Sequence, residues 1–160
     1  MKTIILFILS FLLFIGLSGC KQKDEFNYNQ LSVANPYESV ESSDAFKDDL
    51  DIVISAPIGA TNITYYIINK KVAQIDFLLN DVFYTYRASK SVSSMLHGNY
   101  ETVKKYEQFF IENNIEVNIN TTESDKKVVT WEYKNINYSL TAESPVNNED
   151  LLSFVQNSLN

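Results

Sequence analysis

The chain has 160 residues, of which 20 are acidic and 13 are lysine or arginine, and its formal net charge is −7. This length suits a single domain with its own hydrophobic core. The net negative charge and the lack of any basic run longer than a lysine pair argue against nucleic acid as a partner and against electrostatic binding to anionic lipid.

The N-terminus has the pattern of a signal sequence. Lys2 precedes an apolar run over residues 4–17, and small residues follow the run. The run is too short to span a bilayer comfortably, because a transmembrane helix needs about 20 apolar residues. We therefore expect a signal peptide over residues 1–19.

The signal ends in the tetrapeptide LSGC at residues 17–20, which resembles the lipobox of bacterial lipoprotein precursors. This resemblance implies cleavage between Gly19 and Cys20 and a lipid on Cys20, which places the protein on the extracytoplasmic face of the cell membrane. Cys20 is the only cysteine, so no internal disulfide can form. An ordinary secretory signal and an uncleaved anchor are the alternatives.

Residues 20–35 are mostly polar and have no sustained period, which predicts a flexible tether behind the lipidated cysteine. Proline restricts the residue before it to extended geometry, so Asn35-Pro36 marks the start of the domain. The remaining residues, 36–160, are expected to form a single α+β domain.

Residues 40–50 predict a short helix, with Ser42 or Ser43 as N-cap and Phe46 and Leu50 four residues apart on its buried side. Several acidic residues surround this segment. Their spacing lacks the central glycine and the closing glutamate of an EF-hand loop, so we expect a solvated face and no metal site.

Three runs then predict an antiparallel meander. They cover residues 63–68, 73–79 and 82–87, with polar turns at 69–71 and 80–81.

Arg87, the only arginine, ends the third run. It can face an anionic ligand, whereas pairing with a carboxylate or capping the rim of the sheet is the commoner role of such a residue. Aromatic rings stack on sugars when they are exposed, and on core neighbours when they are not. Arg87, Tyr84 and Tyr86 are therefore the candidate ligand-binding residues, although Tyr84 and Tyr86 alternate with Arg87 along the strand.

Residues 88–100 look like an excursion from the sheet, with one or two helical turns over residues 91–96 and a turn at Gly98-Asn99. His97, the only histidine, lies there. The chain has no nucleophile elbow, no metal-ligand spacing and no glycine-rich phosphate loop. We therefore expect no catalytic residue, no metal and no cofactor, and a protein that is not an enzyme.

Residues 101–112 fit either a helix or a strand. Asn113-Asn114 favours the strand, because asparagine tolerates the positive φ of a tight hairpin turn, so we predict a hairpin that begins near Tyr106.

Alternating residues at 129–133 and 136–142 predict two more strands. After Pro145, Asn147 or Asn148 can cap a C-terminal helix whose apolar stripe covers the sheet. The expected fold is α+β: an antiparallel meander of six or seven strands, with an N-terminal and a C-terminal helix on one face.

Scattered motifs of the domain are similar to a bacterial family defined only as a domain of unknown function, DUF family 4367, which occurs in lipoproteins and in membrane proteins that resemble anti-sigma factors. Order and spacing carry this resemblance over nearly the whole domain. The matching pieces are Asn35-Pro36, Ala45-Phe46, Pro57, Tyr84-Thr85-Tyr86-Arg87, Gly98-Asn99-Tyr100, Trp131 and Tyr138-Ser139-Leu140. The stretch at residues 91–94 departs from the family pattern. The resemblance implies a location and a fold, and no activity.

The sequence is compatible with three functions. The favoured one is a non-enzymatic envelope lipoprotein that binds a membrane protein or a wall component. The second is a glycan or peptidoglycan binder. A contiguous exposed row drawn from Tyr65, Tyr66, Tyr84 and Tyr86 would support this function, whereas burial of all four would exclude it. The third is an envelope hydrolase that uses paired carboxylates.

Overall fold

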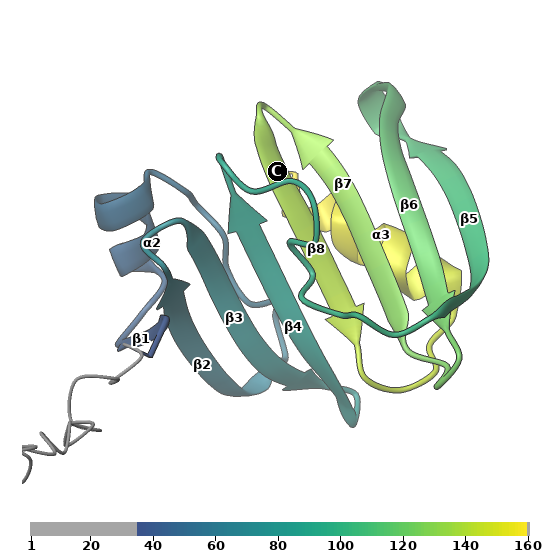
Figure 1. Ribbon diagram of the computed structural model, residues 1–160, viewed down its shortest axis with the longest axis horizontal. Helices are drawn as coiled ribbons and strands as arrows, with labels where there is room; N and C mark the ends of the chain where they lie inside the picture. Colours follow the sequence, from purple (N-terminus) through teal and green to yellow (C-terminus); the bar gives the residue numbers. More distant parts are fainter. Residues whose placement is uncertain (1–34, 160) are drawn as a thin grey trace, which may run out of the picture. The chain divides into compact units, whose positions relative to one another are not determined.

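The computed structural model describes residues 35–159, which belong to one compact unit. The signal peptide, the cleavage site at Gly19 and Cys20, and the tether up to residue 34 lie outside the described residues. The elements are β1 (Tyr37–Val40), α2 (Asp44–Leu50), β2 (Thr61–Ile68), β3 (Val72–Leu79), β4 (Val82–Ser89), β5 (Val103–Ile111), the 3-10 turn η3 (Glu112–Asn114), β6 (Ile115–Thr122), β7 (Lys127–Tyr133), β8 (Ile136–Ala142) and α3 (Asn148–Ser158) (Figure 1).

All eight strands form one antiparallel sheet in the order β1-β2-β3-β4-β8-β7-β6-β5. The sheet consists of two four-stranded meanders, β1 to β4 and β5 to β8, which join where β4 pairs with β8. In that pairing Thr85 lies opposite Thr141 and Arg87 lies opposite Ser139. The centre of the sheet is therefore built from two segments that are distant in the sequence.

Polar residues with positive φ close the tight hairpins. At residues 69–70, 80–81 and 134–135, φ lies between 50° and 62°. Such left-handed pairs match the twist of the flanking strands, which is why two-residue hairpins use them. Asn113 and Asn114 have φ of 61° and 57° between β5 and β6. The hairpin that the sequence predicts from about Tyr106 is confirmed, and its first strand begins three residues earlier.

One face of the sheet is apolar and carries both helices. Phe154 of α3 meets the ring of Tyr86 edge to face at 5.2 Å, and Phe46 of α2 contacts Tyr65 at 6.1 Å. Tyr65 pairs with Ile75, and Ile75 pairs with Tyr86, so both helices lie on the same side. Tyr86, Ile75 and Phe46 are essentially inaccessible to solvent.

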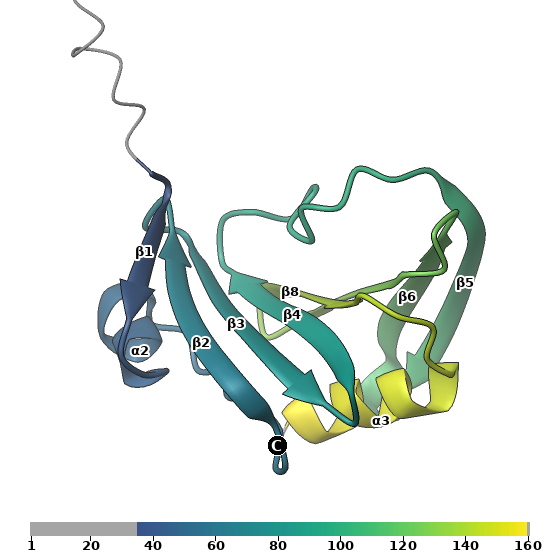
Figure 2. The same cartoon turned by 90° about the horizontal axis from the view of Figure 1, so that it is seen from below.

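The other face of the sheet is polar. Eight side chains, one from each strand, form a row across it: Ser39, Tyr66, Gln74, Arg87, Ser139, Thr130, Asn118 and Gln108. The connection between β4 and β5 crosses the sheet on this side, opposite α3 (Figure 2). This outer face is where polar groups and a crossing loop can enclose a site.

The expected α+β class with an antiparallel sheet and two helices is confirmed, but its details differ. The described residues contain eight strands instead of six or seven. The expectation missed β1, because this strand of four residues is held by its pairing with β2 and has no apolar alternation of its own. The first helix begins at Asp44, after β1. The helical turns expected over residues 91–96 are not formed, and the chain makes a single turn at residues 94–97 instead. Within residues 35–159, neither helix has the length and apolar character needed to cross a membrane.

Candidate functional site

A pocket of about 490 Å³ lies between the polar face at β4 and β8 and the end of the crossing loop. We call it the loop pocket. The lining residues are Thr85, Arg87, His97, Gly98, Asn99, Tyr100, Glu101, Lys126, Thr141 and Glu143. Both meanders contribute side chains, so the β4–β8 pairing that joins them also creates the pocket.

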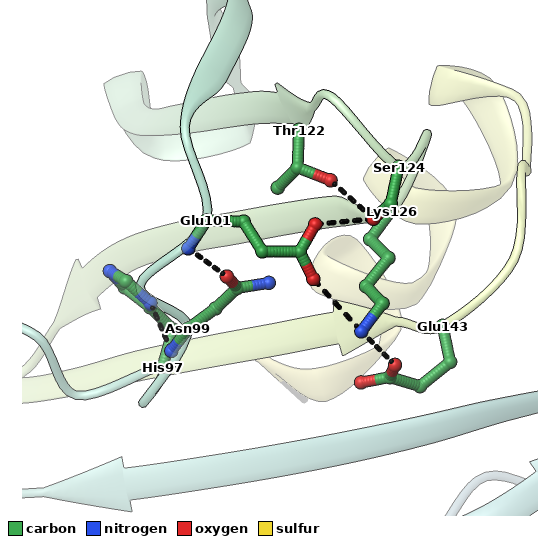
Figure 3. Close-up of polar contacts among 7 residues, drawn as sticks. All are labelled: His97, Asn99, Glu101, Thr122, Ser124, Lys126 and Glu143. Carbon is green, nitrogen blue, oxygen red and sulfur yellow. Dashed lines mark hydrogen bonds and ion pairs between the residues drawn. The ribbon is translucent and has the colours of Figure 1, made fainter.

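Lys126 links two carboxylates on one side of the loop pocket. Its Nζ lies 3.0 Å from Glu101 Oε1 and 2.8 Å from Glu143 Oε2 (Figure 3). All three side chains are partly exposed, between 28% and 38%. The hydrogen bonds from Lys126 to Glu143 and Glu101 raise the pKa of the lysine. Glu101, Lys126 and Glu143 together carry a formal charge of −1, so the positive charge of Lys126 is neutralised by its two partners.

Hydroxyl groups complete the surroundings of Glu101. Ser124 Oγ donates to Glu101 Oε2, and the hydroxyls of Ser124 and Thr122 lie 3.1 Å apart (Figure 3). The Ser124 hydrogen bond, followed by that of Lys126, lowers the pKa of Glu101. Glu101 is therefore a carboxylate at neutral pH.

The loop residues hold one another through short-range hydrogen bonds. The Glu101 backbone N–H donates to Asn99 Oδ1 at 2.8 Å, and the Asn99 backbone N–H donates to His97 Nδ1 at 2.9 Å (Figure 3). A nitrogen that accepts carries no proton, so the neutral His97 ring bears its hydrogen on Nε2. Burial and, next, the nearby charge of Arg87 lower the pKa of His97, which keeps the ring neutral at physiological pH.

Arg87 of β4 lines the loop pocket. Its Nε donates to Gln74 Oε1 at 2.7 Å, and its Nη1 donates to the Leu96 carbonyl at 3.0 Å. Gln74 in turn donates to both carboxylate oxygens of Asp76, at 3.0 and 2.9 Å. Among the described residues no carboxylate lies within 4.0 Å of the guanidinium, so Arg87 has hydrogen-bond partners but no direct counter-ion.

Gly98 is the residue that lets the loop approach Arg87. Its φ is +65°, and a Cβ at this position would lie 2.2 Å from Arg87 Nη1. Only glycine has both the conformational freedom and the missing side chain that this contact requires.

Two hydroxyls beneath the crossing loop have no hydrogen-bond partner among residues 35–159. Thr141 is 4% exposed and lines the loop pocket, and Ser139 is 1% exposed and lies opposite Arg87 in the β4–β8 ladder. Buried hydroxyls are nearly always paired in folded proteins, because an unpaired one loses its hydrogen bonds to water. The Thr141 hydroxyl is therefore a group that a bound ligand would satisfy.

The structure separates the three residues that the sequence offered as ligand-binding. Arg87 lines the loop pocket, whereas Tyr84 and Tyr86 lie on the opposite, apolar face and are 8% and 1% exposed. Tyr84 stacks on Phe77 at 5.3 Å, and Tyr86 packs against Trp131 at 5.9 Å. The two tyrosines are core residues for a simple reason: strand residues one apart point to opposite faces.

Of the residues that line the loop pocket, the sequence suggests only Arg87 as a ligand-binding residue. Glu101, Lys126, Glu143 and Thr141 come from three different segments, and no short-range signal connects them. His97 and the Gly98-Asn99 turn were noticed, but as features of a loop. Among the described residues, no three His, Cys, Asp or Glu side chains gather closely enough to hold a metal ion.

Comparisons of the chain with protein-family models, with curated proteins and with solved structures find no match. The similarity to DUF family 4367 therefore stays a prediction.

Proposed function

We propose that this chain is an envelope lipoprotein, anchored to the extracytoplasmic face of the cell membrane through a lipid on Cys20, that binds a ligand and does not catalyse a reaction. The location rests on the signal pattern and on the tetrapeptide at residues 17–20. The binding role rests on the loop pocket, and above all on one observation: Arg87 lines it, and its guanidinium, which donates to Gln74, Leu96 and Tyr37, has no carboxylate partner among the described residues.

The chemistry of the lining defines a class of ligand. Arg87 offers a planar fork that suits a carboxylate or a phosphate group. The formal charges of the ionised lining side chains sum to zero, so the pocket favours a ligand with one anionic group over a polyanion. Asn99, Thr141 and the two carboxylates supply hydrogen-bond partners for hydroxyl groups. An acidic saccharide, with one anionic group and several hydroxyls, combines these features.

An aromatic ring at the loop pocket supports a saccharide as the ligand. Tyr100 belongs to the lining and is 80% exposed, although large apolar rings are normally covered. Rings in this situation stack on the apolar face of a sugar. Tyr100 is not one of the four tyrosines that the sequence suggested for an exposed row.

The alternative of a carboxylate hydrolase has less support. Glu101 and Glu143 do lie in one pocket, but a glycosidase needs one carboxyl group whose raised pKa keeps it protonated near neutral pH. Here Lys126 bridges the two carboxylates, and the pKa of Glu101 is lowered. Both groups are thus acceptors for hydrogen bonds, which suits binding.

Calorimetric titration of the purified full chain tests the proposal. The probes are a hexuronic-acid oligosaccharide, the matching neutral hexose oligosaccharide and inorganic phosphate. We expect the acidic oligosaccharide to bind more tightly than the neutral one, and Arg87→Lys to weaken binding about tenfold, because lysine keeps the charge but loses the bidentate geometry. Thr141→Val, which keeps the shape and removes the hydroxyl, should also weaken binding.

Two controls make this test decisive. Lys104→Gln removes a cation outside the loop pocket and should leave the affinity unchanged. Ser139→Ala removes the other unpartnered hydroxyl, which does not line the pocket, and should also leave it unchanged. Equal affinity of Arg87→Lys and the parent, or no binding of any probe, would overturn the proposed site. Release of reducing ends that is lost in Glu143→Gln would establish a hydrolase instead.

A further inference from the structure

The strand β5 forms one edge of the sheet, and within residues 35–159 it pairs only with β6 (Figure 1). It is nine residues long, whereas the opposite edge, β1, has four. A long unpaired edge exposes a row of backbone N–H and C=O groups that can template another strand. The two edges of this sheet therefore differ in their capacity to pair.

The side chains of β5 add apolar surface to this edge. Tyr106 and Phe110 are 59% and 61% exposed, and both lie on the outer face, where they pair with Asn120 and Glu116 of β6. Charged side chains, especially lysines, are one means by which natural proteins protect such an edge. Here Lys105 forms an ion pair with Glu107 at 2.9 Å, and Lys104 pairs with Asp125. The lysines of β5 are thus neutralised within their own chain.

From this arrangement we propose that β5 is the interface of a symmetric dimer, in which it pairs antiparallel with β5 of a second copy about a two-fold axis at Gln108. A bulge between Val103 and Lys105 ends the regular part of the strand, so the regular residues are 105–111. Gln108 is the midpoint of that segment. Pairing about Gln108 therefore uses the whole regular segment of both copies.

The side chains of β5 fit a two-fold axis at Gln108 better than an axis at either neighbouring residue. About Gln108, Tyr106 faces Phe110 of the second copy twice, and aromatic cross-strand pairs are stabilising. At each end, Lys104 lies next to Glu112 of the second copy. Lys104 already pairs with Asp125 in its own chain, but this register places no like charges opposite each other. A shift of the axis to Glu107 would place two glutamates directly opposite each other, and a shift to Phe109 would shorten the ladder. Charge and length together select Gln108.

Cysteine cross-linking of the full chain in its native membranes tests this interface. Residues opposite each other on paired strands have Cα atoms about 4.5–5.5 Å apart, which is within the range of a disulfide. Gln108→Cys should therefore give an oxidant-dependent band of twice the chain mass. Tyr106→Cys lies about 13 Å from its own symmetry mate in this register, since strands rise about 3.3 Å per residue, and should not cross-link.

Three comparisons complete the test. The parent, which has only Cys20, gives the background, and Ser39→Cys on the opposite edge strand is the matched control. In the Gln108→Cys background, Lys104→Glu should reduce the dimer about tenfold, because it opposes like charges at both ends of the ladder. Adding Glu112→Lys should restore it.

The interface is supported if Gln108→Cys gives the cross-linked dimer, Lys104→Glu reduces it, and the added Glu112→Lys restores it. Several outcomes would overturn it: no band above background, equal bands at Gln108, Tyr106 and Ser39, a cross-linked species of another mass, or no recovery in the double reversal. A partner peptide on this edge would give the species of another mass. The result does not depend on the loop pocket, so either proposal can fail alone.

Discussion

Arg87 and Gly98 depend on each other at the centre of the loop pocket. The guanidinium fills the space in which a Cβ of residue 98 would lie, and the positive φ of Gly98 lets the loop turn over it. The contact with Gly98 and the hydrogen bond to the Leu96 carbonyl therefore hold the crossing loop against the only arginine. This contact connects the stability of the loop to the geometry of the proposed site.

Gly98→Ala should lower the free energy of unfolding by about 2–3 kcal/mol, because alanine adds both a left-handed backbone penalty and a clash with Arg87. Urea unfolding measures it. Gly59→Ala is the matched control, since Gly59 also has a positive φ but its nearest atom is Leu79 Cδ1 at 3.8 Å. That control should lose only about 1 kcal/mol. Equal losses in the two variants would contradict the role of the Arg87 contact.

The carboxylate of Glu101 gives the protein a predictable response to acid. Because its folded pKa lies below the ordinary value of 4.5, its charged form contributes stability above that value, and the contribution is lost as the pH falls through the lowered pKa. Glu101→Gln should therefore destabilise the protein at pH 7, and the difference from the parent should vanish in strong acid.

Urea unfolding at a series of pH values measures this difference. Glu132→Gln removes an exposed carboxylate on β7 that forms no ion pair among the described residues, and its stability difference should stay small throughout. If the effect of Glu101→Gln is as large in strong acid as at pH 7, ionisation of Glu101 is not its cause.

At the scale of elements, α3 begins at a side-chain cap. Asn147 Oδ1 accepts a hydrogen bond from the Asp150 backbone N–H at 2.8 Å, and Leu151 and Val155 of the same helix are buried against the sheet. The cap satisfies a backbone donor that the first turn of a helix leaves unpaired. The sequence offered both Asn147 and Asn148 as caps, and the structure selects Asn147.

Asn147→Ala should lower the free energy of unfolding by about 1 kcal/mol, since it removes this cap. Thermal or urea unfolding checks the value. Asn157→Ala, at an exposed position of the same helix, is expected to stay within about 0.5 kcal/mol of the parent. A cap variant as stable as this control would show that packing alone fixes the start of α3.

The β5–β6 hairpin shows how a local signal resolved an ambiguous element. Residues 101–112 fitted a helix as well as a strand, and Asn113-Asn114 decided for the strand. The structure confirms the decision, with both asparagines at positive φ. Turn chemistry was informative because it depends on two residues and not on the rest of the fold.

For the whole molecule, the decisive pairing is the one between β4 and β8. It joins the two meanders, brings Arg87 next to Ser139 and Thr85 next to Thr141, and leaves the crossing loop above them. Within residues 35–159, the same arrangement leaves β5 as an edge strand that pairs only with β6. Both proposals thus arise from one topological feature.

The location of the molecule is tested at Cys20. Metabolic labelling with a fatty-acid probe should tag the parent and not Cys20→Ala, and this variant should also keep its signal peptide and lose its lipid-dependent membrane retention. Lys21→Ala, which changes the next residue, should be labelled like the parent. Tagging of Cys20→Ala, or unchanged processing, would contradict the proposed anchor.

The sequence by itself determined what depends on neighbouring residues: the alternation that makes the strands, the asparagine turns, the choice of Asn147 or Asn148 as the cap of α3, and the signal pattern around Cys20. It also placed Tyr84 and Tyr86 on the face opposite Arg87, since side chains alternate along a strand. The tertiary structure alone decided that α3 packs on the apolar face to which these tyrosines belong and that β1 pairs with β2. It alone also decided that one pocket is lined by Arg87 together with Glu101, Lys126, Glu143 and Thr141. Those contacts join residues far apart in the chain, and their energy comes from burial and pairing that no local window contains.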